Sequence, residues 1–311
     1  MKRNSIITLI LTLAFAPIFA GQTDNMQVIE GAFPVKKYDK SQCEIIYIWD
    51  GVKMAGKITE PSAPYAKKKN IPCASVKKPS IELHLLKSNK PMPIVLICPG
   101  GAYNWLSIDH EGKKIVDFFK SHNISSAILR YRVPNNMDGA LMDAQRAIRI
   151  LRANAKKWNL DPDKICIMGF SAGASLSART STNFATNSYE PLDDTDKLSS
   201  RPNLTCLIYP AYCSQPEKDR RIKNTKLAKE GVDYNTRYKI ADWNIVSKET
   251  PPAFITQTQF DPYVDASLAY YLALKDAGVP AELHMLPKGA HGHQNPKVFE
   301  MLIHWLKSHK F

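Results

Sequence analysis

Apolar and polar positions follow two different periods along most of the chain. Continuous apolar runs, such as those at 94–98 and 164–168, are typical of strands buried inside a sheet. Between such runs, apolar side chains recur at three- and four-residue steps, as at residues 141–151, which gives a helix one apolar face. Strand and helix therefore alternate from about residue 81 onward.

The full pattern predicts eight strands and five helices. The strands are expected at 45–48, 81–86, 94–98, 126–129, 164–168, 206–209, 253–257 and 281–286, and the helices at 111–121, 141–151, 172–179, 263–277 and 299–307. Such alternation predicts an α/β fold with a mostly parallel central sheet and helices on both faces. Ligands of these sheets bind beyond the carboxyl ends of the strands, so residues directly after strands are the first candidates for a functional site.

The first twenty residues have a different character. Lys2 and Arg3 precede an apolar run from Ile6 to Phe15, and Ala20 supplies a small residue at a cleavage point. This layout is typical of a secretory signal peptide, and the apolar run is shorter than the roughly 20 residues of a membrane-spanning helix. We expect residues 1–20 to be a signal peptide, the protein to be exported (periplasmic or secreted), and no stable membrane insertion after cleavage.

The rest of the chain divides into two parts. Residues 21–75 are rich in Pro and Lys and hold one predicted strand, which predicts an N-terminal arm packed on the main domain. Residues 76–311 carry the regular alternation and form the predicted main domain. Lys and Arg exceed Asp and Glu by 42 to 29, but they are spread along the chain and accompany no nucleic-acid motif. A solvated basic surface is therefore expected, with no nucleic acid as partner.

Six cysteines occur without any CxxC pair, which argues against a zinc ribbon or a thioredoxin-type redox site. Cys98 and Cys166 fall inside predicted central strands and are expected to be buried free thiols. The remaining four leave two pairings open, Cys43 with Cys73 and Cys206 with Cys213.

A candidate nucleophile follows the strand at 164–168. The stretch Gly169-Phe170-Ser171-Ala172-Gly173 has the form G-x-S-x-G and opens a predicted helix. In this strand–turn–helix context the pattern indicates a nucleophile elbow, in which a sharp turn presents the serine hydroxyl at the helix N-terminus. The flanking glycines leave room for the strand and the helix to approach each other.

Serine needs a base within reach, and the base needs an orienting carboxylate. His291 lies in a loop of small residues after the last predicted strand, with His293 as its nearest rival. Asp261 follows the strand at 253–257 and precedes a proline, where it also suits a helix N-cap; Asp265 is the competing carboxylate. The order Ser171, Asp261, His291 is that of α/β-hydrolases. The pair of histidines lacks a third ligand nearby, so no metal is expected.

The loop after the strand at 94–98 is the candidate oxyanion hole. It follows Pro99 as Gly100-Gly101-Ala102-Tyr103, and glycines let backbone N–H groups face a ligand unobstructed. We expect N–H donors from Gly101 or Ala102 and from Ala172. Tyr103 and Trp105 lie just beyond and are candidates for stacking on a sugar or for ordinary packing.

These motifs resemble one family in particular. They are similar to motifs of the acetyl xylan esterase-like α/β-hydrolases, which are related to dienelactone hydrolases and prolyl oligopeptidase-type domains. The similar stretches are Cys98-Pro99-Gly100-Gly101-Ala102-Tyr103, Leu129 to Pro134, Asp143 to Ala147, Gly169 to Gly173, Ser200-Arg201-Pro202, Asp261 to Val264, and Glu282-Leu283-His284 ahead of Gly289 to Gly292. The likeness runs from about Ile46 to the C-terminus. Two departures stand out. The family usually has a third glycine where Ala102 stands, and Gly-His where Ala174 and Ser175 stand.

The resemblance implies a serine esterase that removes acetyl groups from polysaccharides or oligosaccharides such as acetylated xylan, without a cofactor. Two alternatives remain from the sequence. A prolyl-peptidase-like serine peptidase shares the elbow and the triad order, and a non-catalytic binding protein on the same fold would lack or misplace a triad residue.

Overall fold

The computed structural model describes residues 43–60, 73–215 and 238–311. The predicted signal peptide and much of the predicted arm lie outside this range. In the described part the strands are β1 Glu44–Tyr47, β2 Ser80–His84, β3 Met92–Cys98, β4 Ser125–Arg130, β5 Leu160–Phe170, β6 Leu204–Ile208, β7 Ala253–Thr258 and β8 Ala281–Leu286. The α-helices are α2 Lys114–Ser121, α3 Met137–Ala153, α4 Ala172–Thr182, α7 Val264–Asp276 and α8 Pro296–Ser308.

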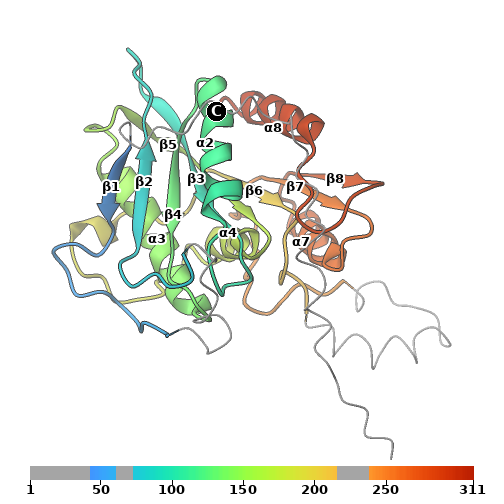
Figure 1. The fold of residues 1–311 in the computed structure, drawn as a ribbon, viewed down its shortest axis with the longest axis horizontal. Coiled ribbons are helices and arrows are strands. Elements are labelled where there is room, and N and C mark those ends of the chain that lie inside the picture. Colours follow the sequence, from blue (N-terminus) through green and yellow to red (C-terminus); the bar gives the residue numbers. More distant parts are fainter. Residues whose placement is uncertain (1–42, 61–72, 216–237) are drawn as a thin grey trace, which may run out of the picture.

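One sheet of eight strands organises the described residues, in the order β1-β2-β4-β3-β5-β6-β7-β8 (Figure 1). The pairs β1–β2 and β2–β4 are antiparallel, and every other neighbouring pair is parallel. The predicted mostly parallel sheet is therefore confirmed. Within the parallel part, strands that run in the same direction bring their carboxyl ends to one edge, where the loops that follow them meet.

Helices cover both faces of the sheet (Figure 1). Phe118 of α2 packs against Phe299 of α8 with ring centroids 5.2 Å apart. On the other face, small residues of α4 share an apolar cluster with α7, including Ala174, Ala178 and Tyr270. Because both faces are covered, Ile94 to Cys98 of the central strand β3 form a continuous apolar run and are fully buried.

The predicted elements differ from the structure mainly at their ends. A π-helical turn at Asp109–Lys113 precedes α2, so the predicted helix at 111–121 begins irregularly. The described part of the predicted arm contributes the edge strand β1, which pairs with β2. In the described residues no helix is both long and apolar enough to cross a bilayer.

All six cysteines are free thiols. Cys98 and Cys166 are buried, as predicted. Neither of the pairings left open by the sequence is formed. Cys206 instead faces Cys166 of the neighbouring strand, with the two sulfurs 3.5 Å apart in a thiol contact.

Candidate active site

Ser171 occupies the sharp turn between β5 and α4. Its backbone has φ 52° and ψ −117°, a strained conformation for a residue with a side chain. The surroundings enforce it, because the Ser171 N–H donates to Ile208 O at 3.1 Å and the Ser171 carbonyl accepts from Ala211 N at 3.2 Å. The predicted elbow is thus present, with the serine backbone fixed to the end of β6.

Two glycines permit this turn. A Cβ on Gly169 would lie 2.1 Å from Gly173 O, and a Cβ on Gly173 would lie 2.0 Å from Cys98 O. Real Cβ atoms do not approach backbone oxygens so closely, so any side chain here would force the strand, the helix and the end of β3 apart. The G-x-S-x-G spacing has this steric cause.

The structure brings Ser171, His291 and Asp261 together from three separate loops. Ser171 Oγ lies 2.7 Å from His291 Nε2, and His291 Nδ1 lies 2.8 Å from Asp261 Oδ2. The Asp261 side chain is fully buried, whereas His291 is partly accessible. Asp261 Oδ1 accepts from the Tyr263 N–H at 2.8 Å, so the N-cap-like role and the contact with His291 use different oxygens. Such an arrangement can transfer the serine proton to an oriented imidazole.

The rival residues lie elsewhere. Asp265 is the second residue of α7, past the loop that carries Asp261. His293 packs against Gly289, where a Cβ would lie 2.6 Å from the imidazole Cγ. The carboxylate that contacts His291 Nδ1 is that of Asp261, at 2.8 Å, and the imidazole that contacts Ser171 Oγ is that of His291.

Aromatic rings hold the imidazole from two sides. The Tyr263 ring lies 4.9 Å and the Tyr209 ring 5.4 Å from the His291 ring, both nearly edge-on. Edge-to-face packing of this kind restricts the orientation of the imidazole. The ring of His291 is therefore positioned by packing as well as by Asp261.

The predicted oxyanion loop lies directly beside the elbow. A Cβ on Gly100 would lie 3.0 Å from Ser171 Cβ, so the loop and the serine are close neighbours. Gly101, Ala102 and Tyr103 all have positive φ, at 129°, 54° and 58°. Within the described residues the N–H groups of Gly101, Ala102 and Ala172 donate to no backbone carbonyl, so they are available to a ligand.

The two predicted sugar-stacking residues differ in accessibility. Tyr103 is only 3% exposed because its ring packs against Tyr131 and Tyr212, with centroids 6.1 and 6.3 Å away. It offers almost no surface for stacking, and packing is the role that the structure gives it. Trp105 is half-buried, and its carbonyl fills the space beside Gly101.

Three further residues that the sequence did not single out lie behind the oxyanion loop. Glu111 Oε2 accepts from the Gly100 N–H at 2.6 Å, and Glu111 Oε1 accepts from Tyr209 OH at 2.9 Å. Gln294 Nε2 donates to the hydroxyl oxygen of Tyr209 at 3.2 Å. In the sequence Glu111 was indistinguishable from the solvent-exposed acids of a helix start, and only its burial and these contacts reveal it.

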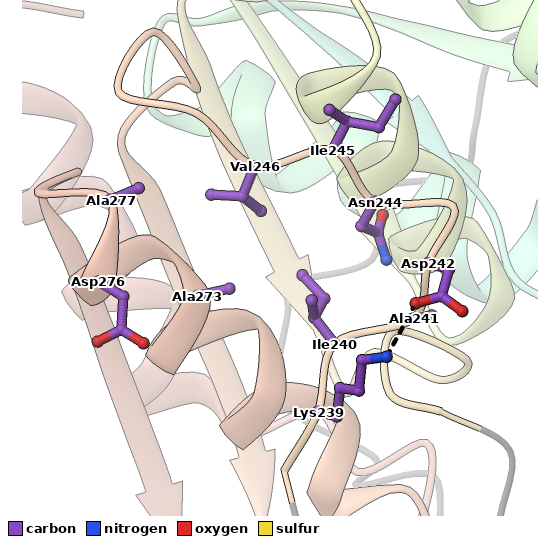
Figure 2. Close-up of a pocket in the computed structure, with 10 residues that line it drawn as sticks. All are labelled: Lys239, Ile240, Ala241, Asp242, Asn244, Ile245, Val246, Ala273, Asp276 and Ala277. Atoms are coloured by element: carbon purple, nitrogen blue, oxygen red, sulfur yellow. Dashed lines mark ion pairs between the residues drawn. The ribbon is translucent and has the colours of Figure 1, made fainter. Parts of the chain in front are cut away.

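Two other places among the described residues gather polar side chains. A surface hollow of about 550 Å³ lies between residues 239–246 and α7, where Lys239 pairs with Asp242 at 3.4 Å; its lining has no nucleophile beside a base (Figure 2). Among the described residues, Cys43, Glu82 and His84 bring three potential metal ligands within 4.8 Å of one another. The Arg130 guanidinium, 2.8 Å from Glu82, already occupies that carboxylate.

Comparisons with known proteins agree with the fold. A family model described as alpha/beta hydrolase fold matches residues 95–295. An acetylxylan esterase of Xylanibacter ruminicola is 32% identical over 68% of this chain and 44% of its own length. Endo-1,4-beta-xylanase B of Butyrivibrio fibrisolvens is 29% identical over 69% of this chain and 34% of its own. The chain thus spans less than half the length of these two curated relatives.

A solved structure gives more complete coverage. The acetyl ester-xyloside bifunctional hydrolase from Caldicellulosiruptor lactoaceticus is similar with a TM-score of 0.66 and 30% identity, over 86% of this chain and 97% of that one. The similarities to an acetylxylan esterase and to this hydrolase confirm the resemblance that the sequence motifs predict. With the sheet order, the strand–Ser171–helix turn and the family match in hand, the chain belongs to the α/β-hydrolase fold family.

Proposed function

We propose that this protein is a serine esterase that removes acetyl groups from an acetylated polysaccharide or oligosaccharide such as xylan. The observation that carries the proposal is the continuous contact from Ser171 Oγ to His291 Nε2 at 2.7 Å and from His291 Nδ1 to Asp261 Oδ2 at 2.8 Å. The similarity to an acetylxylan esterase and to an acetyl ester-xyloside hydrolase supports the choice of an acetyl ester on a glycan.

The first half of the reaction forms an acyl-enzyme. His291 Nε2 takes the proton of Ser171 Oγ as the oxygen attacks the acetyl carbonyl carbon, while Asp261 holds the imidazole through Nδ1–H. Negative charge develops on the carbonyl oxygen, which the N–H groups of Ala172 and of Gly101 or Ala102 are proposed to stabilise. His291 then gives its proton to the sugar oxygen, the C–O bond breaks, and the deacetylated glycan leaves.

The second half regenerates the serine. Water attacks the acetyl carbonyl of the acyl-enzyme and gives its proton to His291 Nε2. The tetrahedral intermediate collapses, the bond to Ser171 Oγ breaks, and the serine recovers its proton as acetate leaves.

The test is acetate release from acetylated xylan by the purified protein and by its Ser171→Ala variant. Release that falls by about 10⁴-fold or more in the variant supports both the reaction and the nucleophile. Activity that survives in a folded Ser171→Ala variant would contradict the proposal.

Two further substrates separate the alternatives. Cleavage of short p-nitrophenyl esters without acetate release from xylan would keep the triad and reject the glycan. Cleavage of a proline peptide but of no acetyl ester would favour a serine peptidase. A folded protein that cleaves none of these and binds acetylated glycan would be a binding protein on the same fold.

A further inference from the structure

Glu111 is a buried acid at the centre of the site that the proposed reaction does not use. It lies in the π-helical turn Asp109–Lys113 and is only 6% exposed. Among the described residues no ion pair joins it to a Lys or Arg, whereas the buried acids Glu82, Asp143 and Asp196 each pair with an arginine and the buried Asp261 pairs with His291. Single π-helical turns occur frequently at functional sites. A buried carboxylate without a cationic partner is costly, so its retention calls for an explanation.

Neutral donors surround this carboxylate instead. The Gly100 N–H donates to Oε2 at 2.6 Å and Tyr209 OH donates to Oε1 at 2.9 Å. Burial raises the pKa of Glu111, and the hydrogen bonds from Tyr209 and Gly100, together with the charge of protonated His291, oppose that rise. The other titratable group that it faces is Tyr131, whose pKa is raised by burial first and by the Glu111 charge among lesser causes. Donors on both oxygens suit the ionised acid.

The contacts of Glu111 extend to the loop that carries His291. Tyr209 lies directly after β6, packs its ring 5.4 Å from the His291 ring and accepts from Gln294 Nε2 at 3.2 Å. Gln294 is three residues after His291. A single network of buried and partly buried groups thus joins the oxyanion loop after β3, the end of β6 and the histidine loop.

We propose that Glu111 is a positioning residue for hydrolysis at Ser171. It fixes the Gly100 N–H, and with it the direction of the following Gly101 and Ala102 N–H groups, relative to the histidine loop through Tyr209 and Gln294. This inference rests on the proposed esterase function. A displacement of oxyanion donors weakens interactions made only in the transition state, so the loss falls on kcat rather than on KM.

The variants separate position from charge. Glu111→Ala removes both acceptors, and we expect kcat for a p-nitrophenyl acetate to fall by about 10²-fold with KM within about threefold. Glu111→Gln keeps one acceptor for the Gly100 N–H and offers an amide to the Tyr209 oxygen, so it recovers most of the lost rate. Tyr209→Phe cuts the connection to Gln294 and keeps the Gly100 contact, with a loss of roughly tenfold or less.

A matched control is available on the far flank of the fold. Tyr189 OH donates to Asp196 Oδ1 at 2.5 Å, a buried tyrosine–carboxylate hydrogen bond of the same chemistry. Tyr189→Phe is expected to lower the unfolding midpoint and to leave kcat unchanged. If Tyr189→Phe lowers kcat as much as Glu111→Ala does, the loss reflects general loosening and the proposal is wrong. It is equally wrong if folded Glu111→Ala keeps kcat within twofold of the parent.

A second readout works without any ester. Ser171 Oγ displaces fluoride from the phosphorus of a fluorophosphonate as its proton passes to His291, and the rate of labelling depends on the same oxyanion donors. Slow labelling in Glu111→Ala, with recovery in Glu111→Gln, supports the inference even if the parent releases no acetate from xylan. Equal labelling rates in all three proteins would overturn it. A parent that neither labels nor cleaves esters would refute the proposed function itself. Should Glu111→Ala not fold, Tyr209→Phe carries the test: a loss of kcat of up to roughly tenfold with KM unchanged supports the inference, and a kcat equal to that of Tyr189→Phe overturns it.

Discussion

The Ser171 site and the flank where α3 meets residues 44–57 both bury charged side chains, but they hold them in opposite ways. At the site, Asp261 and Glu111 accept hydrogen bonds from an imidazole, a tyrosine hydroxyl and backbone N–H groups. At the flank, each buried acid faces an arginine: Asp143 lies 2.9 Å from Arg132, and Asp196 lies 2.8 Å from Arg146.

The flank uses its charges to fasten a segment. Asp143 accepts from Trp49 Nε1 at 2.7 Å and from the Arg132 N–H at 2.8 Å. Arg146 Nε donates to Ile48 O at 3.0 Å, and Arg132 donates to the carbonyl of Ala55. Residues 48–55 are thereby held against α3 by two guanidinium groups.

The difference separates two uses of buried charge. Each buried acid of the flank is paired with an arginine, and removal of one partner would leave an uncompensated buried charge. The flank therefore contributes to the stability of the fold. The acids at the site accept instead from the groups that position His291 and the oxyanion loop, so they serve the orientation of these groups. Substitutions in the two regions should therefore damage different properties.

The largest expected effect is at the site. Asp261→Asn leaves the shape of the side chain intact but cannot hold His291 in the required tautomer, and we expect kcat/KM to fall by about 10⁴-fold. The unfolding midpoint should stay near that of the parent. Steady-state kinetics on a p-nitrophenyl acetate give the first quantity and thermal unfolding gives the second. Asp265→Asn is the matched control and should change the rate only a few-fold; the reverse outcome would identify Asp265 as the orienting acid.

At the flank the expected loss is in stability. Asp143→Ala leaves the Arg132 guanidinium, 1% exposed, without its counter-ion, which should lower the free energy of unfolding by about 3–5 kcal/mol. Urea titration measures the change. The rate per active site, counted by fluorophosphonate labelling, should remain that of the parent. A stable variant with a lower rate would remove the distinction between the two regions.

The oxyanion loop offers a test of strain at the site. Gly101 has φ 129°, and a Cβ on it would lie 2.1 Å from Trp105 O, so Gly101→Ala must move the loop. We expect kcat to fall by about 10²–10³-fold. Gly51 has φ 74° with nothing within 4 Å of a Cβ, so Gly51→Ala isolates the backbone penalty. That control should cost about 1–2 kcal/mol of stability and leave kcat unchanged.

The smallest effect concerns the pH dependence of stability. Because burial raises the pKa of Glu111 above its value in the unfolded chain, ionisation of this acid destabilises the fold as the pH rises. Below about pH 4.3, where the acid is protonated in both states, the penalty is absent. The free energy of unfolding of Glu111→Gln relative to the parent should therefore increase from pH 4 to pH 8. Urea titrations at both pH values measure it, and a difference that does not change with pH would contradict the assignment.

Local patterns predicted most of the fold, and they placed the candidate nucleophile in the strand–helix turn where the structure has Ser171. The apolar runs predicted the strands, and the clash that excludes a side chain at Gly169 arises from Gly173, four residues away, although the one at Gly173 arises from the distant Cys98. Asp261 and Asp265 were harder to separate, because the choice depends on where α7 begins. Glu111, Tyr209 and Gln294 are far apart in the sequence, and only the packing of three loops makes them neighbours. The burial of Tyr103 also depends on residues that are distant in the sequence, because the rings of Tyr131 and Tyr212 pack against it.

The hold of Arg132 and Arg146 on residues 48–55 has a consequence for anyone who shortens or fuses this polypeptide. The carbonyls of Ile48 and Ala55 take the place of the water that a buried guanidinium would otherwise need. A version that starts after residue 60 would keep every residue of the Ser171 site yet remove the two carbonyls that accept from Arg132 and Arg146, and expose the surface that residues 48–55 cover. A trimmed protein should therefore begin no later than Cys43, and a tag or partner domain belongs ahead of it.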